Sequence, residues 1–165
     1  MALSDGVVLL RAFSETDAPA LAATWADPAI RARNSVPEPS EDAAREWVAS
    51  RGDWEWAIVD VATGEVAGRR ALKDVDWERR RAEAACWVAP WARGRRFAAR
   101  SLRLAAAHAF AHGLAAIDAE CETDNQAAFG SLVVTGLRQV GTRHEPPAVH
   151  VFELLPEDLA AAAAL

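Results

Sequence analysis

The sequence predicts a mixed α/β fold in which helices flank one central sheet. Short apolar runs with β-branched residues alternate with stretches of helical periodicity along the 165 residues. In the first half, strands are joined by a hairpin turn, whereas in the second half helices connect the strands. A composition of 52% hydrophobic and 25% charged residues is typical of a globular protein with one core. We therefore expect a single domain over residues 1–165, built on a mainly antiparallel sheet of about seven strands.

The first half of the chain is expected to contain three helices and three strands. Ser14 and Ser40 are typical N-caps, and Pro28 is favoured in the first turn of a helix. Gly64 marks a hairpin turn between two strand-like runs. The helices are expected over residues 17–25, 28–33 and 40–52, and the strands over residues 7–11, 54–60 and 66–73.

The second half is expected to contain four strands and two helices. Asn125 is placed to cap the second of these helices, and Gly113 and Gly136 follow the ends of the two helical patterns. The strands are expected over residues 82–88, 117–122, 137–142 and 150–154, and the helices over residues 97–112 and 125–135. An alanine-rich tail follows Pro156.

A basic loop separates the fourth expected strand from the following helix. It contains Arg93, Gly94, Arg95 and Arg96, and no acidic residue occurs between residues 89 and 107. The first N–H groups of a helix have no intrahelical partner, and the helix dipole adds positive charge there. A strand that leads through a basic loop into a helix therefore indicates a phosphate-binding site.

The overall composition restricts the possible partners and the cellular location. The formal net charge of −6 argues against general nucleic-acid binding, which needs a basic surface. No apolar stretch is long enough to cross a bilayer, so we expect no membrane association. The two cysteines, Cys86 and Cys121, lie in strand-like runs and are interpreted as buried reduced thiols. We expect a cytoplasmic protein that is a monomer or a homodimer.

The ordered series of motifs resembles the GNAT superfamily of N-acetyltransferases, and most closely the branch of ribosomal-protein alanine N-acetyltransferases. The resemblance covers nearly the whole chain. The motifs that carry it are Leu9-Leu10-Arg11, the Thr63-Gly64-Glu65 turn with Gly68, Val88-Ala89-Pro90, Arg93-Gly94-Arg95, His112-Gly113-Leu114, Asn125, Gly136 and Leu155-Pro156-Glu157-Asp158-Leu159. It implies acetyl-coenzyme A as co-substrate, and a splayed pair of strands where the coenzyme binds.

The resemblance also assigns expected roles to residues of this chain. Trp87 and Val88 would pair with the pantetheine arm, and Asn125 with Ala128 would lie near the thioester. The pyrophosphate would be bound by Arg93, Gly94, Arg95, Arg96, Phe97 and Ala98. Glu83 matches an acidic family position and is either the general base or an ordinary carboxylate on the sheet face. Trp25, Asn34 and Trp54 fall where the superfamily builds its acceptor pocket.

Several positions depart from the family pattern. Arg96 replaces a small residue of the loop, and its side chain could point outward or obstruct the coenzyme. Ala128 replaces a serine that is taken to assist the leaving thiolate, and Leu137 replaces a phenylalanine. His108 and His112 have helical i, i+4 spacing, but no third ligand stands out and we expect no metal.

The sequence therefore predicts an acetyl-coenzyme A-dependent N-acyltransferase. The acceptor would be the primary amine of a peptide, of a protein N-terminus or of a small molecule, attacking directly. Two alternatives remain open at this stage. One is a degenerate, non-catalytic protein of the same fold that binds or regulates. The other is a transferase that uses another acyl or an aminoacyl donor.

Overall fold

A computed structural model describes residues 2–163 of the chain. Within these residues, eight strands form one sheet in the order β1-β2-β3-β4-β5-β6-β8-β7. The chain groups into two compact units: unit 1 ends at Ala71 and resumes over Cys86–Phe97, and unit 2 contains Leu72–Ala85 and the chain from Ala98 onward. Strands β4 (Val66–Asp76) and β5 (Arg81–Val88) each run from one unit into the other.

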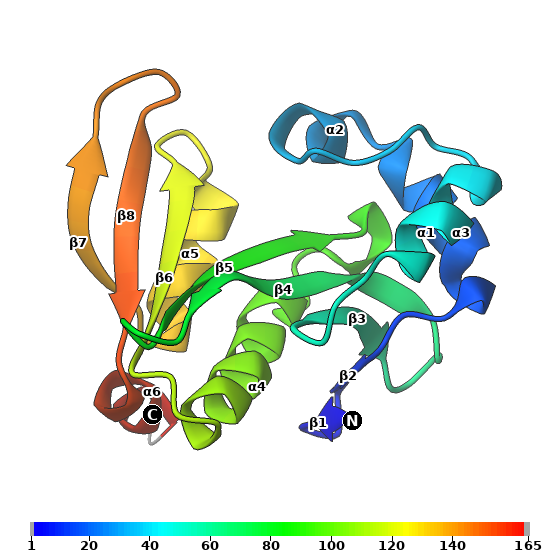
Figure 1. The fold of residues 1–165 in the computed structure, drawn as a ribbon. Coiled ribbons are helices and arrows are strands. Elements are labelled where there is room, and N and C mark those ends of the chain that lie inside the picture. Colours follow the sequence, from blue (N-terminus) through cyan, green and yellow to red (C-terminus); the bar gives the residue numbers. More distant parts are fainter. Residues whose placement is uncertain (1, 164–165) are drawn as a thin grey trace. The chain divides into compact units, whose positions relative to one another are not determined.

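Unit 1 contains an antiparallel meander with helices beside it (Figure 1). Neighbouring strands pair in antiparallel fashion, and the β2–β3 register places Leu10 opposite Ile58. Ser14, Asp27 and Ser40 cap the helical segments that follow them through side-chain oxygens. The elements are β1 (Leu3–Ser4), β2 (Val8–Arg11), the 3-10 turn η1 (Glu15–Asp17), α1 (Ala18–Trp25), α2 (Pro28–Arg33), α3 (Glu41–Ala49), β3 (Glu55–Asp60) and the 3-10 turn η2 (Pro90–Ala92).

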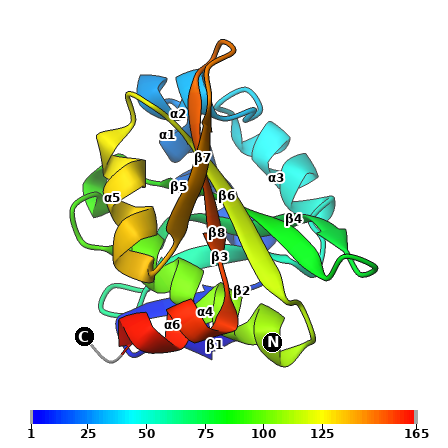
Figure 2. The same ribbon diagram turned by 90° about the vertical axis from the view of Figure 1, so that its left-hand side faces the viewer.

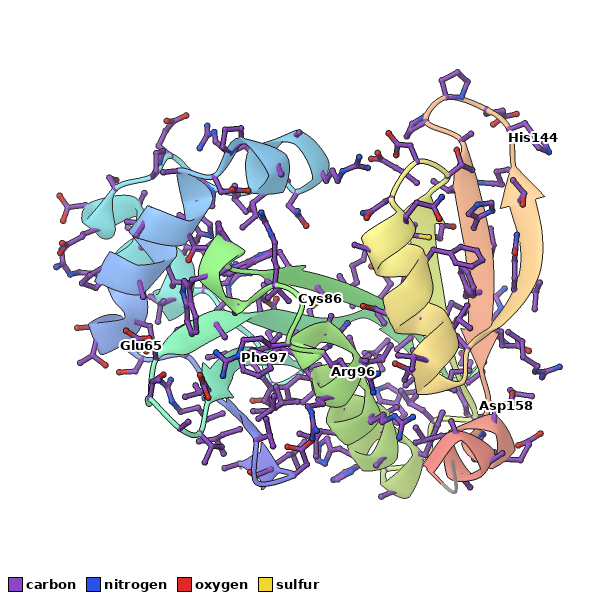
Figure 3. All side chains as sticks on the ribbon, turned by 180° about the vertical axis from the view of Figure 1, so that it is seen from behind. Glu65, Cys86, Arg96, Phe97, His144 and Asp158 are labelled. Carbon is purple, nitrogen blue, oxygen red and sulfur yellow. The ribbon has the colours of Figure 1, made fainter. Side chains whose placement is uncertain are left out.

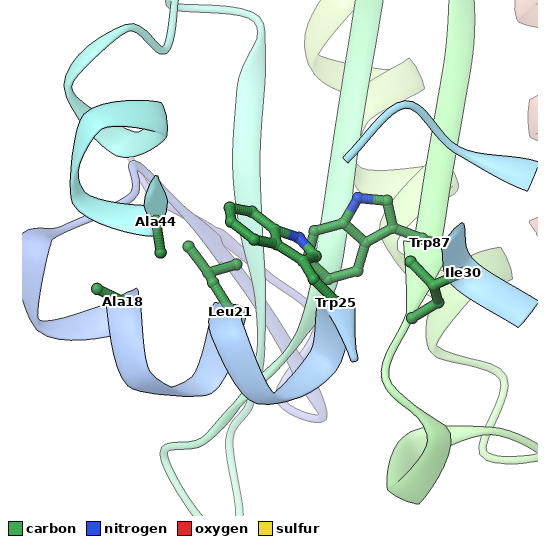
Figure 4. Close-up of a cluster of buried hydrophobic side chains, with 6 residues drawn as sticks. All are labelled: Ala18, Leu21, Trp25, Ile30, Ala44 and Trp87. Atoms are coloured by element: carbon green, nitrogen blue, oxygen red, sulfur yellow. The ribbon is translucent and has the colours of Figure 1, made fainter. Parts of the chain in front are cut away.

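Helices α1, α2 and α3 of unit 1 bury one apolar cluster together with β5. Figure 4 shows its members, which are Ala18, Leu21, Trp25, Ile30, Ala44 and Trp87. Trp47 adds an edge-on contact, with its ring centroid 5.4 Å from that of Trp25. Because buried aromatic side chains contribute the largest apolar areas, this cluster fixes α1 and α2 against the end of β5.

Unit 2 contains the strands and helices of the second half of the chain (Figure 2). Strand β6 pairs in parallel with the first half of β5, with Glu83 opposite Asp118, and β8 pairs antiparallel with both β6 and β7. Phe129 of α5 contacts Phe152 of β8 edge-on, with ring centroids 5.4 Å apart. The elements are α4 (Phe97–Ala111), β6 (Ala116–Glu122), α5 (Gln126–Thr135), β7 (Arg138–Arg143), β8 (Val149–Leu154) and α6 (Pro156–Ala163).

The structure confirms the predicted mixed, mainly antiparallel sheet flanked by helices. It adds β1, a strand of two residues that is too short to leave a pattern in the sequence. Strand β4 extends three residues beyond its expected end at residue 73, and the tail forms α6. The splaying of β5 from β6 remains a prediction, as does the single domain. No helix among the described residues has the length and apolar character needed to cross a bilayer.

Candidate active site

The end of β5 lies against the backbone of β4 within unit 1. The Ala89 amide donates a hydrogen bond of 2.7 Å to the Ala67 carbonyl. A methyl group built on Gly68 would lie 2.3 Å from the Trp87 carbonyl oxygen and 3.1 Å from the Val88 Cα. Only glycine permits this approach, because any side chain would displace the backbone of the segment predicted to pair with the pantetheine arm.

A β-bulge in β4 lies at the residue that accepts the Ala89 hydrogen bond. The β3–β4 register passes from Ile58 opposite Gly68 to Val59 opposite Val66, so Ala67 is the extra residue. The carbonyl of Ala67 is the group that accepts the Ala89 amide. The bulged residue Ala67 therefore binds the backbone at Ala89, directly after the end of β5.

The basic loop has two residues in the left-handed backbone region. Gly94 has φ of +76° and Arg96 has φ of +62°, and α4 begins at the next residue, Phe97 (Figure 3). Phe97 is buried, and the Arg95 guanidinium lies 4.6 Å from its ring centroid. Left-handed residues that alternate with other conformations make concave arrangements of backbone N–H groups, which bind anions. The role of this loop as a phosphate site stays a prediction.

Two of the loop arginines form ion pairs inside unit 1. Arg93 Nη2 lies 2.8 Å from Asp27 Oδ1, and Arg95 Nη1 lies 2.9 Å from Asp60 Oδ2. The hydrogen bond from Arg93 is the main cause that lowers the pKa of Asp27, and amides of α2 add to it. Neither acid was singled out as a partner of this loop from the sequence, because both pairs join distant parts of the chain.

Asp60 is held more deeply than Asp27. Its side chain is 1% exposed, and Oδ1 accepts the Ala62 amide at 3.0 Å. Burial opposes ionisation, but the Ala62 amide, the Arg95 guanidinium and the Thr63 hydroxyl together hold the pKa of Asp60 below its usual value. Oδ2 has no hydrogen bond among the described residues, since Arg95 approaches it as an ion pair without hydrogen-bond geometry.

Arg96 has neither an ion pair nor a hydrogen bond within residues 2–163, and it is exposed. It occupies the position where the family pattern has a small residue. A left-handed conformation costs a non-glycine residue about 1–2 kcal/mol. A glycine at this position would be free of that strain, because only glycine adopts positive φ without a steric cost.

Replacing Arg96 by glycine should stabilise the protein. Relief of the left-handed strain, less the added flexibility of the unfolded chain, gives an expected gain of about 0.5–1 kcal/mol in the free energy of unfolding. Urea denaturation of Arg96→Gly measures it. Gly94→Ala is the matched control, and it should lower the free energy of unfolding. Gly94 has φ of +76° and a methyl group there meets nothing within 4 Å, so only the backbone strain is added. A less stable Arg96→Gly variant would contradict this explanation.

The part of the predicted site in unit 2 begins at Asn125. This residue caps α5, and its Oδ1 accepts the Ala128 amide at 3.1 Å. Its Nδ2 group has no partner among the described residues, so its donors are available to a ligand. Ala128 is half-buried in the first turn of α5 and brings no hydroxyl group.

Glu83 lines a groove of about 300 Å³ on the sheet of unit 2. Asp74, Arg81, Asp118 and Glu120 also line this groove. Lys73 Nζ lies 2.8 Å from Glu83 Oε1, and the Glu83 side chain is 34% exposed. The carboxylate is thus accessible but ion-paired, and its role as a general base stays a prediction.

The three predicted acceptor residues have different environments in unit 1. Trp25 is completely buried in the cluster of Figure 4, and its Nε1 has no hydrogen-bond partner among the described residues. Asn34 donates from Nδ2 to the Ile30 carbonyl at 3.0 Å, which closes the end of α2. Trp54 is half-buried and contacts Trp56 edge-on, with ring centroids 6.1 Å apart. The acceptor role of all three stays a prediction.

His108 lies on α4, whereas His112 follows the end of this helix at Ala111, one residue before the expected end. Their ring centroids are 4.1 Å apart, and His112 Nδ1 lies 2.8 Å from the His108 carbonyl oxygen. In the part of the chain that the structure describes, no three histidine, cysteine or acidic side chains gather as metal ligands would.

Comparisons with known structures support the fold. An acetyltransferase of the GNAT family from Bacillus anthracis superposes with a TM-score of 0.83 at 16% identity, covering 95% of this chain and 99% of that one. A putative ribosomal-protein-serine acetyltransferase from Vibrio cholerae gives 0.79 at 16% identity, with 94% and 98% covered. A ribosomal L7/L12 alpha-N-protein acetyltransferase in complex with coenzyme A gives 0.81 at 17% identity, also with 94% and 98% covered.

The sequence comparisons define the family. Among curated proteins, no match was found. The family model described as an acetyltransferase (GNAT) domain matches residues 8–137, which include the whole basic loop, Glu83 and Asn125. The chain therefore belongs to the GNAT acetyltransferase family.

Proposed function

We propose that this protein transfers an acetyl group from acetyl-coenzyme A to a primary amine. The observation that carries the proposal is the basic loop, with Gly94 and Arg96 in left-handed conformations directly before α4. Such a loop at a helix N-terminus suits a diphosphate, and the family uses this loop for its coenzyme. The acceptor class follows the resemblance to ribosomal-protein N-acetyltransferases, and is a peptide, a protein N-terminus or a small amine.

The proposal assigns coenzyme contacts to three parts of the chain. The loop and first turn of α4 would hold the diphosphate, and the end of β5 at Trp87 and Val88 would pair with the pantetheine arm. The free donors of Asn125 Nδ2 are suited to an amide oxygen near the thioester. When bound, the coenzyme supplies a thioester carbonyl that an amine can attack.

The chain itself would supply orientation, a proton acceptor and a donor for the developing negative charge. Positioning alone can contribute about 7–11 kcal/mol to the barrier reduction. Glu83, directly or through water, would take a proton from the ammonium group of the acceptor, so that the neutral amine can attack the thioester carbonyl. A backbone amide near Val88 would stabilise the oxygen of the attacked carbonyl. Ala128 offers no hydroxyl, so water would protonate the leaving thiolate.

Calorimetry and thiol release test this proposal together. We expect acetyl-coenzyme A to bind with a dissociation constant of about 1 µM or lower. This corresponds to a binding free energy of about −8 kcal/mol or more negative. Thiol release should follow on addition of peptides with a free N-terminus or of small primary amines. Glu83→Gln should reduce turnover by about 100-fold at unchanged coenzyme affinity. Lys73→Met is the control, because it removes the ion pair and keeps the carboxylate.

A second candidate function is supported by the lack of a hydroxyl at Ala128 and by the ion pair of Glu83. In that case the fold binds coenzyme A without catalysing transfer. Binding without thiol release across the amine panel would favour this second function. Absence of any coenzyme binding would contradict both.

A further inference from the structure

Arg93 shares a carboxylate oxygen with the N-terminus of α2. Asp27 Oδ1 accepts the Ile30 amide at 3.0 Å and the Arg93 Nη2 group at 2.8 Å. The cap of α2 therefore does not depend on Arg93, because the Ile30 hydrogen bond is made by the backbone. The guanidinium can leave Asp27 while the helix stays capped.

The exposures of the two partners agree with an exchangeable pair. The Arg93 side chain is 45% exposed and that of Asp27 is 17% exposed. An ion pair whose guanidinium is this accessible contributes little to stability, so the free-energy cost of breaking it is small. The Arg95–Asp60 pair differs, because the Asp60 carboxylate is almost fully buried and also accepts the Ala62 amide. Asp60 thus holds Arg95 in a buried ion pair. Asp27 neutralises Arg93, whose guanidinium remains accessible to another anion.

We propose that Asp27 is an internal counter-ion that competes with the coenzyme phosphates for Arg93. The inference rests on the proposed function, since it concerns the same coenzyme. A diphosphate approaching the loop has to replace the Asp27 carboxylate on Arg93 or share the guanidinium with it. In either case the nearby negative charge repels the ligand. Asp27 therefore lowers the coenzyme affinity of the native protein.

The substitution Asp27→Asn isolates this effect. Asparagine caps helices about as well as aspartate, so α2 should remain folded while the negative charge is lost. We expect coenzyme A to bind about three- to fivefold more tightly to this variant, which is the strength of an exchangeable surface pair. The advantage should decrease as salt is added.

A double-mutant cycle tests whether Asp27 acts through Arg93. Coenzyme A affinity is measured by calorimetry for the native protein, Asp27→Asn, Arg93→Met and the double variant. The proposal predicts tighter binding on Asp27→Asn only when Arg93 is present. An equal gain in the Arg93→Met background would overturn it, because the effect would then be a general one of charge. An unchanged affinity of Asp27→Asn would overturn it as well.

Two controls separate the possible failures. Asp42→Asn removes the same charge from unit 1 at an exposed residue of α3 whose partner is Arg45, and it should leave the affinity unchanged. Thermal melting of each variant verifies that the α2 cap has survived. If the native protein does not bind coenzyme A, the proposed function fails. If it binds and Asp27→Asn has no effect, only the role of Asp27 is refuted.

Discussion

Replacing Gly68 by alanine is expected to destabilise the protein by about 3 kcal/mol, the upper range of steric overpacking. The added methyl group would lie 2.3 Å from the Trp87 carbonyl oxygen. Because the obstacle is backbone rather than a flexible side chain, either β4 or the end of β5 has to move. Trp87 and Val88 form the end of β5, so we also expect a large loss of coenzyme A affinity. Urea denaturation and calorimetry measure the two effects.

Gly52→Ala is the matched control for this substitution. A methyl group on Gly52 meets nothing within 4 Å, and its backbone is not left-handed. Its coenzyme affinity should therefore equal that of the native protein, and its free energy of unfolding should be equal or up to about 1 kcal/mol higher, because alanine restricts the unfolded chain. If Gly68→Ala were as stable as Gly52→Ala, the close approach of β4 and β5 in this structure would be refuted.

Much of the fold could be predicted because its signals are local. Asp27 before Pro28 and Ser40 before an acidic first turn both cap helices, as their residue types indicate. The hairpin turn at Gly64, with φ of +75°, also follows from the residue type. Strand β1 and the bulge at Ala67 could not be predicted, since both depend on the pairing of neighbouring strands rather than on the residues themselves.

The candidate site was predictable in its position but not in its electrostatics. The basic loop and the cap at Asn125 can be located from residue types that act on their own backbone. The pairing of Arg93 with Asp27 and of Arg95 with Asp60 joins residues far apart in the sequence. The sequence shows five arginines near the start of α4 without an acid among them, whereas the fold supplies the acids from the N-cap of α2 and from β3. The net charge available to a phosphate is therefore smaller than the loop sequence indicates.

The second large effect on stability is expected at Trp25. Its replacement by alanine tests its structural role, and its replacement by phenylalanine tests its predicted role in acceptor binding. Trp25→Ala should cost about 3–5 kcal/mol, because the side chain is completely buried and its removal leaves a cavity. Trp77→Ala is the control, since Trp77 is 52% exposed and its loss should cost less than about 1 kcal/mol. Chemical denaturation of both variants provides the comparison.

Trp25→Phe removes the unpaired indole N–H group and keeps an aromatic ring in the core. An unsatisfied buried donor costs about 1–3 kcal/mol, so its removal should largely offset the smaller volume of phenylalanine. The variant is therefore expected to have nearly native stability. If Trp25 only fills the core, the KM for the amine acceptor should stay unchanged. A raised KM at native stability and native coenzyme affinity would show that the acceptor binds this N–H group. Since Trp25 is completely buried in the cluster with Ile30, Ala44 and Trp87, such contact requires this cluster to open when the acceptor binds.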